Sequence, residues 1–395
     1  MFYEQQPEKN KKEYKAMLQL IGELSRLFSD SDCPYLPYRA QENIFCKCLK
    51  ADNLARFDCS ADAKKEAIGI GLKTWMGGND QKIAEFGKLK ERYADLTGIR
   101  LVKAISEYRN ERIRVTKNIH GIDEMIYHIV KRIPNSMQIF ECAFDPIDIE
   151  NISLINNRGN KNNTYFTDGK HTYHFSVSKN TLYMLFEEND MQLFDSFNVN
   201  ILGDPYSVLI ESLKGKEGPD IFVEIPNMRI PLLQEETKER LCIRLYSENN
   251  TRGKFVAEKS GLNQWNAGGR RRDADEVYIP YLRQDRERNP NFFPPRDTHF
   301  TLHLPDGTEV VAKVCQEADP NDPTVGKSIM SSPNRVLGHW LLRDVFELQE
   351  GTLVTYEMLE RFGIDCVIFT KNDELDYSID FAEIGTYEDF YEIEE

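Results

Sequence analysis

The sequence predicts a mixed α+β protein whose first half is an α/β unit and whose second half is mainly β. Residues 13–29 and 39–50 place apolar side chains at helical spacing, which predicts two helices. Residues 68–75 are a compact apolar run that predicts a strand. Beyond residue 140, short alternating segments separated by turns predominate, as is typical of a β domain.

The elements after the first strand continue the α/β pattern. Residues 81–96 are predicted to form a helix, and residues 101–105 a second strand. Farther along, residues 165–166 and 173–177 flank an Asp-Gly turn and predict a hairpin. This order of helices and strands is typical of an α/β core.

A segment with three prolines, residues 219–231, is typical of a linker and divides the chain. We accordingly predict a first domain at 1–228, a second domain at 229–372 and an acidic C-terminal tail at 373–395. The second domain should contain one helix near residues 337–347. Its predicted strands are residues 240–246, 276–279, 299–304, 309–314 and 366–369.

The charge of the chain is acidic overall but unevenly distributed. A formal net charge of −15 argues against a protein that coats nucleic acid without sequence preference. Residues 372–395 contain ten carboxylates and no Lys or Arg, whereas residues 47–117 carry a net +6 and residues 252–296 a net +4. The basic stretches fit local anion binding, although solvated helical or loop faces explain them equally well. The acidic tail is interpreted as a solubilising element or, alternatively, as a lid over a basic groove.

Five residues in the first half fit metal-dependent hydrolysis of a phosphodiester. That reaction needs carboxylates that hold Mg²⁺, a cation or base that orients the attacking water, and tolerance of an anionic backbone. Asp62 precedes the apolar strand, and Lys73 lies within it on the same face as two glycines that leave room beside the lysine. Gln81 and Glu85 are four residues apart on the predicted helix, and Glu42 lies on the helix before Asp62.

This arrangement resembles the PD-(D/E)XK nuclease superfamily, to which most type II restriction endonucleases belong. The usual acid two residues before the lysine is replaced here by Gly71. Some members take the second acid from the next helix, farther along the chain, and Glu85 follows Lys73 by twelve positions. The resemblance implies that Asp62 and Glu85 bind the metal directly and that Glu42 binds it through a water. It implies that Lys73 is the cation that orients the attacking water. Gln81 would orient the phosphate or the lysine.

The second half contains two stretches suited to reading DNA bases. Residues 260–281 (SGLNQWNAGGRRRDADEVYIPY) combine amides, a tryptophan, two glycines and three arginines. Amide side chains form paired hydrogen bonds with adenine edges, and arginines do the same with guanine. Residues 326–346 (GKSIMSSPNRVLGHWLLRDVF) place polar residues ahead of a helix whose apolar side chains are interpreted as core. A solvated loop remains the alternative explanation for the three arginines.

The second half closely resembles the B3-like DNA-recognition domain of type II restriction endonucleases. The resemblance is carried by these two stretches, by the intervening FFPPRDTHFTLHLPDGTEVVAKVCQ and by the later GTLVTYEMLERFGIDCVIF. The resemblance covers residues 231–371. It implies an open seven-stranded pseudobarrel that grips the major groove between an N-arm at 263–272 and a C-arm around 327–334. The DNA-binding residues that it implies are Asn263, Gln264, Trp265, Asn266, Arg270, Arg271, Arg272, Lys327, Ser331 and Asn334.

The two resemblances together imply a site-specific double-stranded DNA endonuclease, a type II restriction enzyme that uses Mg²⁺ or, as a substitute, Mn²⁺. A phospholipase-D-like nuclease, which is joined to several such recognition domains, needs a His-x-Lys pair that this chain lacks. The alternative function is a sequence- or modification-specific DNA-binding protein with an inactive first half. Expected partners are double-stranded DNA and, as an option, a second copy of the chain, with no nucleotide cofactor. Because no apolar run is long enough to cross a bilayer, we expect a cytoplasmic location.

Overall fold

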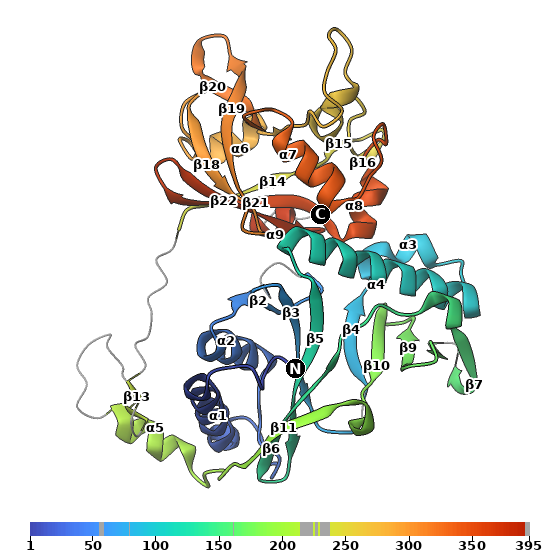
Figure 1. The fold of residues 1–395 in the computed structure, drawn as a ribbon, viewed down its shortest axis with the longest axis vertical. Coiled ribbons are helices and arrows are strands. Elements are labelled where there is room, and N and C mark those ends of the chain that lie inside the picture. The colour runs from blue at the N-terminus through green and yellow to red at the C-terminus, as the bar shows by residue number, and fades with distance from the viewer. Residues whose placement is uncertain are drawn as a thin grey trace.

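The computed structural model describes residues 1–54, 59–78, 80–160, 162–213, 224–225, 228–229 and 238–391. The first half contains two sheets, and the second half contains one barrel-like sheet (Figure 1). The α-helices described in the first half are α1 (Glu8–Glu23), α2 (Tyr38–Leu49), α3 (Lys90–Tyr93), α4 (Gly98–His120) and α5 (Pro205–Leu213). Those described in the second half are α6 (Arg283–Arg288), α7 (Val336–His339), α8 (Tyr356–Phe362) and α9 (Thr386–Phe390).

The larger sheet of the first half is mixed and has six strands among the described residues. Their order is β1 (Asp52–Asn53), β2 (Ala63–Lys65), β3 (Ile68–Trp75), β5 (Glu124–Ile133), β6 (Ser136–Ala143) and β11 (Gln192–Asn198). β3 runs parallel to β5 along its whole length, but β2 pairs only with residues 68–70 of β3. Within the described residues, the other edge of β3 therefore has no strand partner from residue 71 onward.

Helices cover both faces of this sheet. Apolar residues of α1 and α2 pack against Ile70 and Leu72 on one face, and α4 packs on the opposite face, where Tyr127 is buried. The predicted helices at 13–29 and 39–50 are confirmed by α1, which ends in a 3₁₀ turn, and by α2. The predicted strand at 68–75 is confirmed by β3.

The second sheet has the order β4 (Gln81–Glu85), β10 (Thr181–Leu185), β9 (Thr172–Ser176), β8 (Asn163–Thr167) and β7 (Ser153–Asn160). β8 and β9 confirm the predicted hairpin. The prediction of a helix at 81–96 is wrong for its first part. Residues 81–85 hydrogen-bond to β10 as an edge strand, and only Lys90–Tyr93 form an α-helical turn. Gln81 and Glu85 therefore do not share a helix face.

The prediction of a strand at 101–105 is also wrong, because these residues belong to α4. Leu101, Val102 and Ile105 are buried, and the buried positions continue to Arg109 and Ile113. The spacing of buried residues over the whole segment is helical. The apolar run at 101–105 alone is too short to distinguish a helix from a strand.

The second half forms a nearly closed barrel-like sheet. Its strand order is β14 (Arg240–Arg244), β21 (Ile364–Asp373), β22 (Asp376–Glu383), β18 (His299–His303), β19 (Glu309–Asp319), β20 (Asp322–Ser331) and β17 (Ile279–Pro280). The first and last strands, β14 and β17, contact each other, so the seven-stranded pseudobarrel implied by the sequence is present. The predicted helix near 337–347 is α7 continued by a π-helical turn, Trp340–Val345.

The predicted acidic tail at 373–395 is not a separate tail, as far as the structure describes it. β22 lies between β21 and β18, and α9 follows it. The side chains of Tyr377, Ile379 and Phe381 are buried, while the acidic Asp376 and Asp380 alternate with them. Charge counting missed this strand because period-two alternation places its acids on one face and its apolar residues on the other.

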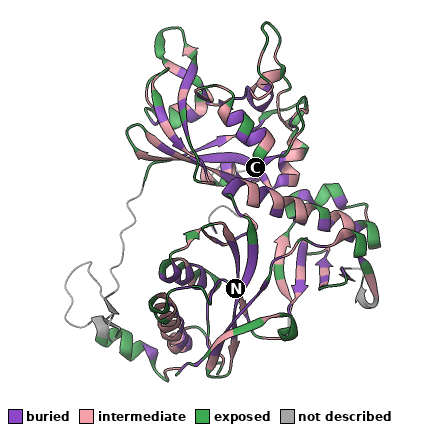
Figure 2. Cartoon of the chain, viewed as in Figure 1, coloured by how far each residue is buried: buried purple, intermediate pink, exposed green. Residues whose placement is uncertain are grey.

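One helix joins the cores of the two halves. Val102 and Ile105 of α4 are buried in the core of the first half, whereas Val115 and Ile119 belong to the apolar core of the barrel. Figure 2 shows the buried residues of both sheets on either side of this helix. The boundary that the sequence places near residue 228 therefore does not separate two independent cores.

The predicted linker at 219–231 lies largely outside the described residues. Within it, β12 (Glu224–Ile225) pairs with β13 (Met228–Arg229). Another small hairpin, β15 (Ser247–Asn249) and β16 (Gly253–Phe255), precedes the first recognition stretch. None of the helices in the described part of the chain has the length and apolarity needed to cross a membrane.

Candidate functional site

The five side chains predicted for catalysis line one pocket of about 910 Å³ between the two halves, here called the interdomain pocket. Glu42 comes from α2, Asp62 from the turn before β2, and Lys73 from β3. Gln81 and Glu85 come from β4. The barrel supplies the opposite wall, through residues that include Phe362, Ile364, Phe381, Glu383 and Ile384.

The unpaired edge of β3 is occupied by side chains instead of a strand. Asp62 Oδ2 accepts a hydrogen bond of 2.6 Å from the backbone N–H of Leu72. Gln41 Nε2 donates one of 3.1 Å to the carbonyl oxygen of Lys73. The pairing of β3 with β2 stops at Ile70, and these two side-chain hydrogen bonds occupy the next part of the same edge. They hold Asp62 beside the backbone of Lys73.

Glu42 is electrostatically coupled to this edge. Its carboxylate is 2.8 Å from Arg39 Nη1, and its residue is buried. Burial and the nearby charge of Asp62 raise the pKa of Glu42, while Arg39 and Lys73 oppose that rise. A buried carboxylate whose ionisation is opposed by a neighbouring carboxylate, as that of Glu42 is, is a site where a cation is favourable.

Lys73 lies over an aromatic platform. Its ammonium is 6.0 Å from the ring centroid of Tyr127, which stacks on Phe144 at 4.1 Å. A Cβ atom at Gly71 would lie 2.9 Å from both rings. The prediction that the glycines leave open room beside the lysine is therefore wrong, because the two rings fill the space next to Gly71. Arg109 Nη2 donates to the Tyr127 hydroxyl at 3.3 Å and fixes the ring.

Gln81 and Glu85 reach the pocket from an edge strand and not from a helix. The Glu85 carboxylate lies 2.5 Å from Lys82 Nζ, and both side chains are more than half exposed. Among the residues that the structure describes, no three His, Cys, Asp or Glu side chains are grouped closely enough to hold one metal ion. The structure thus couples Glu42 with Asp62 and leaves Glu85 farther out on the wall.

Three further lining residues were not among those predicted. Tyr127 contacts Lys73 only through the fold, whereas Arg39 pairs with Glu42 three residues farther along the same helix, a spacing that the sequence contains. His120, the last residue of α4, is buried near Lys64 and the barrel residue Asp306. Burial, reinforced by Lys64, lowers the pKa of His120 to about 4, so its imidazole is neutral at neutral pH.

The predicted N-arm, residues 263–272, forms a compact loop opened by a 3₁₀ turn. Asn263 is fully buried, and its amide bonds the backbone of Ala257 and Val354, accepting from Val354 N–H at 2.9 Å. Its amide is used inside the protein, which gives Asn263 a structural role, and its contact with DNA stays a prediction. Trp265 packs against the barrel core.

The three consecutive arginines have different surroundings. Arg272 Nη1 donates to the carbonyl oxygens of Ala267 and Gly268 and closes the loop on itself. Arg270 pairs with the buried carboxylate of Glu276. Arg271 is exposed and forms no hydrogen bond or ion pair through its side chain within the described residues. Arg272 therefore shapes the loop, while Arg271 is free to contact a ligand.

The predicted C-arm around 327–334 also divides into structural and accessible residues. Ser331 is buried, and its hydroxyl donates to Pro333 O and accepts from Leu337 N–H at 2.9 Å, which holds the start of α7. Ser331 thus has a structural role, and its contact with DNA stays a prediction. Lys327 is exposed, and Asn334 is partly exposed.

Residues 234–373 match the family of NgoFVII C-terminal B3-like DNA-binding domains. This is a restriction-enzyme domain family, and the match covers the barrel up to the end of β21. No curated protein matches the chain. The comparison therefore supports the resemblance of the second half to a B3-like DNA-recognition domain.

In the B3-like domain, the segments that follow the two arms are in tight contact. Gly338 of α7, after the C-arm, lies against Asp275, after the N-arm, since a Cβ at Gly338 would be 1.7 Å from the carbonyl oxygen of Asp275. The Asp275 carboxylate binds His339 at 2.8 Å and Arg343 at 2.7 Å. Of the residues that the resemblance implies for DNA binding, Asn266, Arg270, Arg271 and Lys327 are exposed, and Gln264 and Asn334 are partly exposed. Two of the exposed ones already have partners in the protein, since Asn266 donates to the carbonyl oxygen of Glu258 and Arg270 pairs with Glu276.

Proposed function

We propose that the protein is a type II restriction endonuclease that hydrolyses double-stranded DNA with Mg²⁺. The observation that carries this proposal is the gathering of Glu42, Asp62 and Lys73 at the unpaired edge of β3. The chain also carries a restriction-enzyme DNA-binding domain, which supports DNA as the substrate. The mixed sheet with helices on both faces supports the resemblance of the first half to PD-(D/E)XK nucleases.

The donor set that fits a divalent cation is the pair Glu42 and Asp62. Mg²⁺ is commonly held by one or two carboxylates together with substrate phosphates and waters. The pair is therefore sufficient without Glu85, whose carboxylate is taken by Lys82. A bound cation would polarise the phosphate and lower the pKa of a coordinated water.

The chain's own residues then position the reactants. Lys73 Nζ, supported by the ring of Tyr127, orients the attacking water and offsets charge on the phosphate. The water oxygen bonds to phosphorus, one phosphorus–oxygen ester bond breaks, and the proton lost by the water is balanced by one gained at the leaving oxygen. Gln81, which lines the pocket from β4, would orient the phosphate.

The size of the pocket bears on how DNA enters. A pocket of about 910 Å³ is in the range that holds small ligands, and it is too small for a duplex. The wall formed by Phe381 and Ile384 belongs to the B3-like domain side of the protein. We infer that cleavage requires this wall to move away from β3 so that the scissile phosphate can reach Lys73.

Substitution of Lys73 tests the nuclease proposal. Incubated with plasmid and Mg²⁺ or Mn²⁺, the Lys73→Ala protein should cut about 10²- to 10⁴-fold more slowly than wild type, because water activation is lost. Asp62→Asn should have a similar effect. Lys90→Ala, an exposed lysine on α3 outside the pocket, is the matched control and should cut normally. Equal cutting by Lys73→Ala and wild type would show that the assignment is wrong.

A second candidate function is a DNA-binding protein whose first half is inactive. The absence of a three-carboxylate metal group among the described residues favours it. That function predicts that the wild-type protein binds one duplex sequence in preference to scrambled competitor in a gel-mobility assay. It also predicts that the DNA stays intact with either metal.

Target choice is proposed to depend on the accessible residues of the two arms, and Arg271 is the sharpest test. Arginine paired with guanine contributes about 1–3 kcal/mol of discrimination. Arg271→Ala should therefore relax the sequence preference at one base position, as measured by binding to a library of duplexes. Arg252→Ala, an exposed arginine in the β15–β16 turn, is the control, and an unchanged preference in Arg271→Ala would exclude this role.

A further inference from the structure

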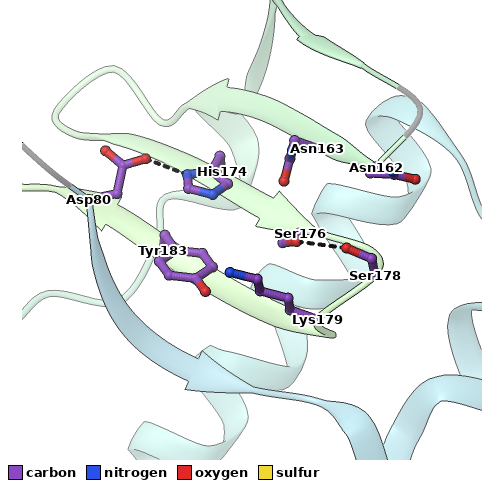
Figure 3. Close-up of a pocket in the computed structure, with 8 residues that line it drawn as sticks. All are labelled: Asp80, Asn162, Asn163, His174, Ser176, Ser178, Lys179 and Tyr183. Carbon is purple, nitrogen blue, oxygen red and sulfur yellow. Dashed lines mark hydrogen bonds and ion pairs between the residues drawn. The ribbon is translucent and has the colours of Figure 1, made fainter.

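A second pocket, of about 390 Å³, lies on the outer face of the five-stranded sheet (Figure 3). Its lining comes from strands β8, β9 and β10 and from the loop before β4. Alternate residues of the same strands, such as Phe166, Phe175 and Leu182, face the buried core. The side chains on the outer face are mostly hydrogen-bond donors, namely those of Asn163, His174, Ser176, Ser178, Lys179 and Tyr183.

The centre of this pocket is a rigid aromatic row. His174 stands between Tyr165 and Tyr183, with ring centroids 4.8 and 4.5 Å apart, and the three residues are direct neighbours across β8, β9 and β10. Asp80 lies 2.6 Å from His174 Nδ1. The imidazole contacts the Asp80 carboxylate, and burial lowers the pKa of His174 while Asp80 opposes that shift.

The cation of the pocket is Lys179. It lies in the turn between β9 and β10, is exposed, and makes no ion pair within the described residues. Its ammonium group is directed toward Tyr183, and the hydroxyls of Ser176 and Ser178 are 3.4 Å apart beside it (Figure 3). An uncommitted ammonium beside several hydroxyl donors is a setting that suits a phosphate group.

The pocket adjoins the interdomain pocket across one strand pair. Asp80 lines the first pocket, and the next residues in the chain, Gln81 and Lys82, line the second. Tyr183 is directly opposite Lys82 in the β4–β10 pair. Directly opposed residues project from the same face of a sheet, so both pockets can be reached from that face.

We propose that the Lys179 pocket binds a phosphate of the nucleic-acid backbone that continues from the interdomain pocket across β4 and β10. The inference rests on the proposed function, because it takes the backbone to enter the interdomain pocket. Lys179 supplies the charge, and the hydroxyls of Ser176 and Ser178 supply hydrogen bonds. A free mononucleotide offers the same phosphate chemistry, and the experiment separates the two sources.

The test measures binding without cleavage. In one experiment, the full-length protein is titrated in EDTA into a long fluorescein-labelled duplex of random sequence, at several salt concentrations. In a separate experiment, AMP binding to the protein is followed by phosphorus NMR. Lys179→Ala should weaken duplex binding several-fold and reduce the slope of log K against log salt by about 1, because one phosphate contact is lost. Lys170→Ala, an exposed lysine at the other end of β8 and β9, is the matched control and should behave as wild type.

Each outcome has a definite meaning. Unchanged duplex affinity and salt slope in Lys179→Ala would overturn the backbone contact. If that variant in addition lost AMP binding, the pocket would be a mononucleotide site instead. Because neither measurement involves cutting, the two failures are distinguishable: plasmid cutting by Lys73→Ala would refute the nuclease proposal, whereas duplex binding by Lys179→Ala decides the phosphate contact.

Discussion

At the scale of single residues, the candidate site depends on contacts between segments that are distant in the sequence. Asp62 and Lys73 could be identified from the sequence because a strand and its preceding turn are local features. Tyr127 and His120 could not, since only the packing of β5 and α4 brings them to the pocket, whereas the spacing of Arg39 and Glu42 on one helix could have identified Arg39. The same limit explains Asn263 and Ser331, whose residue types suit DNA but whose hydrogen bonds are made inside the protein.

Gly71 provides a test of this packing. The acid usual in PD-(D/E)XK nucleases cannot be restored here, because a Cβ would lie 2.9 Å from the rings of Tyr127 and Phe144. Gly71→Asp should lower the free energy of unfolding by about 1–3 kcal/mol and should reduce cleavage. Chemical denaturation and plasmid cutting measure the two effects. A stable Gly71→Asp enzyme with higher activity would contradict the arrangement described.

The raised pKa of Glu42 predicts how activity depends on pH. Protonated Glu42 cannot bind a cation, so cleavage should decline with falling pH at a higher pH than an ordinary glutamate would cause. Arg39 lowers this pKa, so Arg39→Ala should move the acidic limb of the rate profile to still higher pH. The rate of plasmid cutting as a function of pH measures the shift, with Lys90→Ala as control. An acidic limb that stays in place would show that Glu42 does not bind the cation.

At the scale of elements, the sequence predicted those whose pattern is long and self-contained. α2, β3 and the barrel strands β14, β18, β19 and β21 fall into this class, whereas β20 was not predicted and the predicted strand at 276–279 overlaps β17 only at Ile279. Two errors arose where the partner decides the structure. Residues 81–85 become a strand by pairing with β10, and the acidic residues after 373 become β22 by pairing with β21 and β18.

Truncation tests the role of β22. Removal of residues 372–395 deletes a central strand of the barrel together with α9, and it exposes the apolar partners of Phe381. The truncated protein should lose cooperative unfolding of the barrel and lose DNA binding, instead of binding more tightly as a lid would predict. Circular dichroism and fluorescence anisotropy measure both. Leu375→Ser, in the exposed β21–β22 turn, is the control and should bind normally.

At the scale of the whole molecule, α4 makes the two halves one folding unit. Its ends belong to different apolar cores, and ion pairs join the halves beside it, such as Arg92–Glu360 at 2.6 Å and Glu111–Arg361 at 2.9 Å. The sequence could not reveal this, because the apolar stripe of a helix does not identify its partner. The division into recognition and catalysis is therefore one of function and not of folding.

Unfolding measurements can test this unity. Calorimetry should show a single cooperative transition for the whole chain. Ile119→Ser, in the part of α4 that packs in the barrel core, should lower its midpoint by removing about 2–4 kcal/mol of apolar burial. Ile99→Ser, an exposed residue of the same helix, should leave the midpoint unchanged. Two separate transitions, with only the barrel affected by Ile119→Ser, would contradict a shared core.

The placement of α4 has a consequence for how such proteins diversify. A recognition barrel transferred from another enzyme would need a recess complementary to Val115 and Ile119, or it would leave those side chains in water. We therefore expect new target specificities in this lineage to arise by substitution within the two arms. Exchange of the whole recognition domain would be destabilising, because the packing of Val115 and Ile119 in the barrel core would be lost.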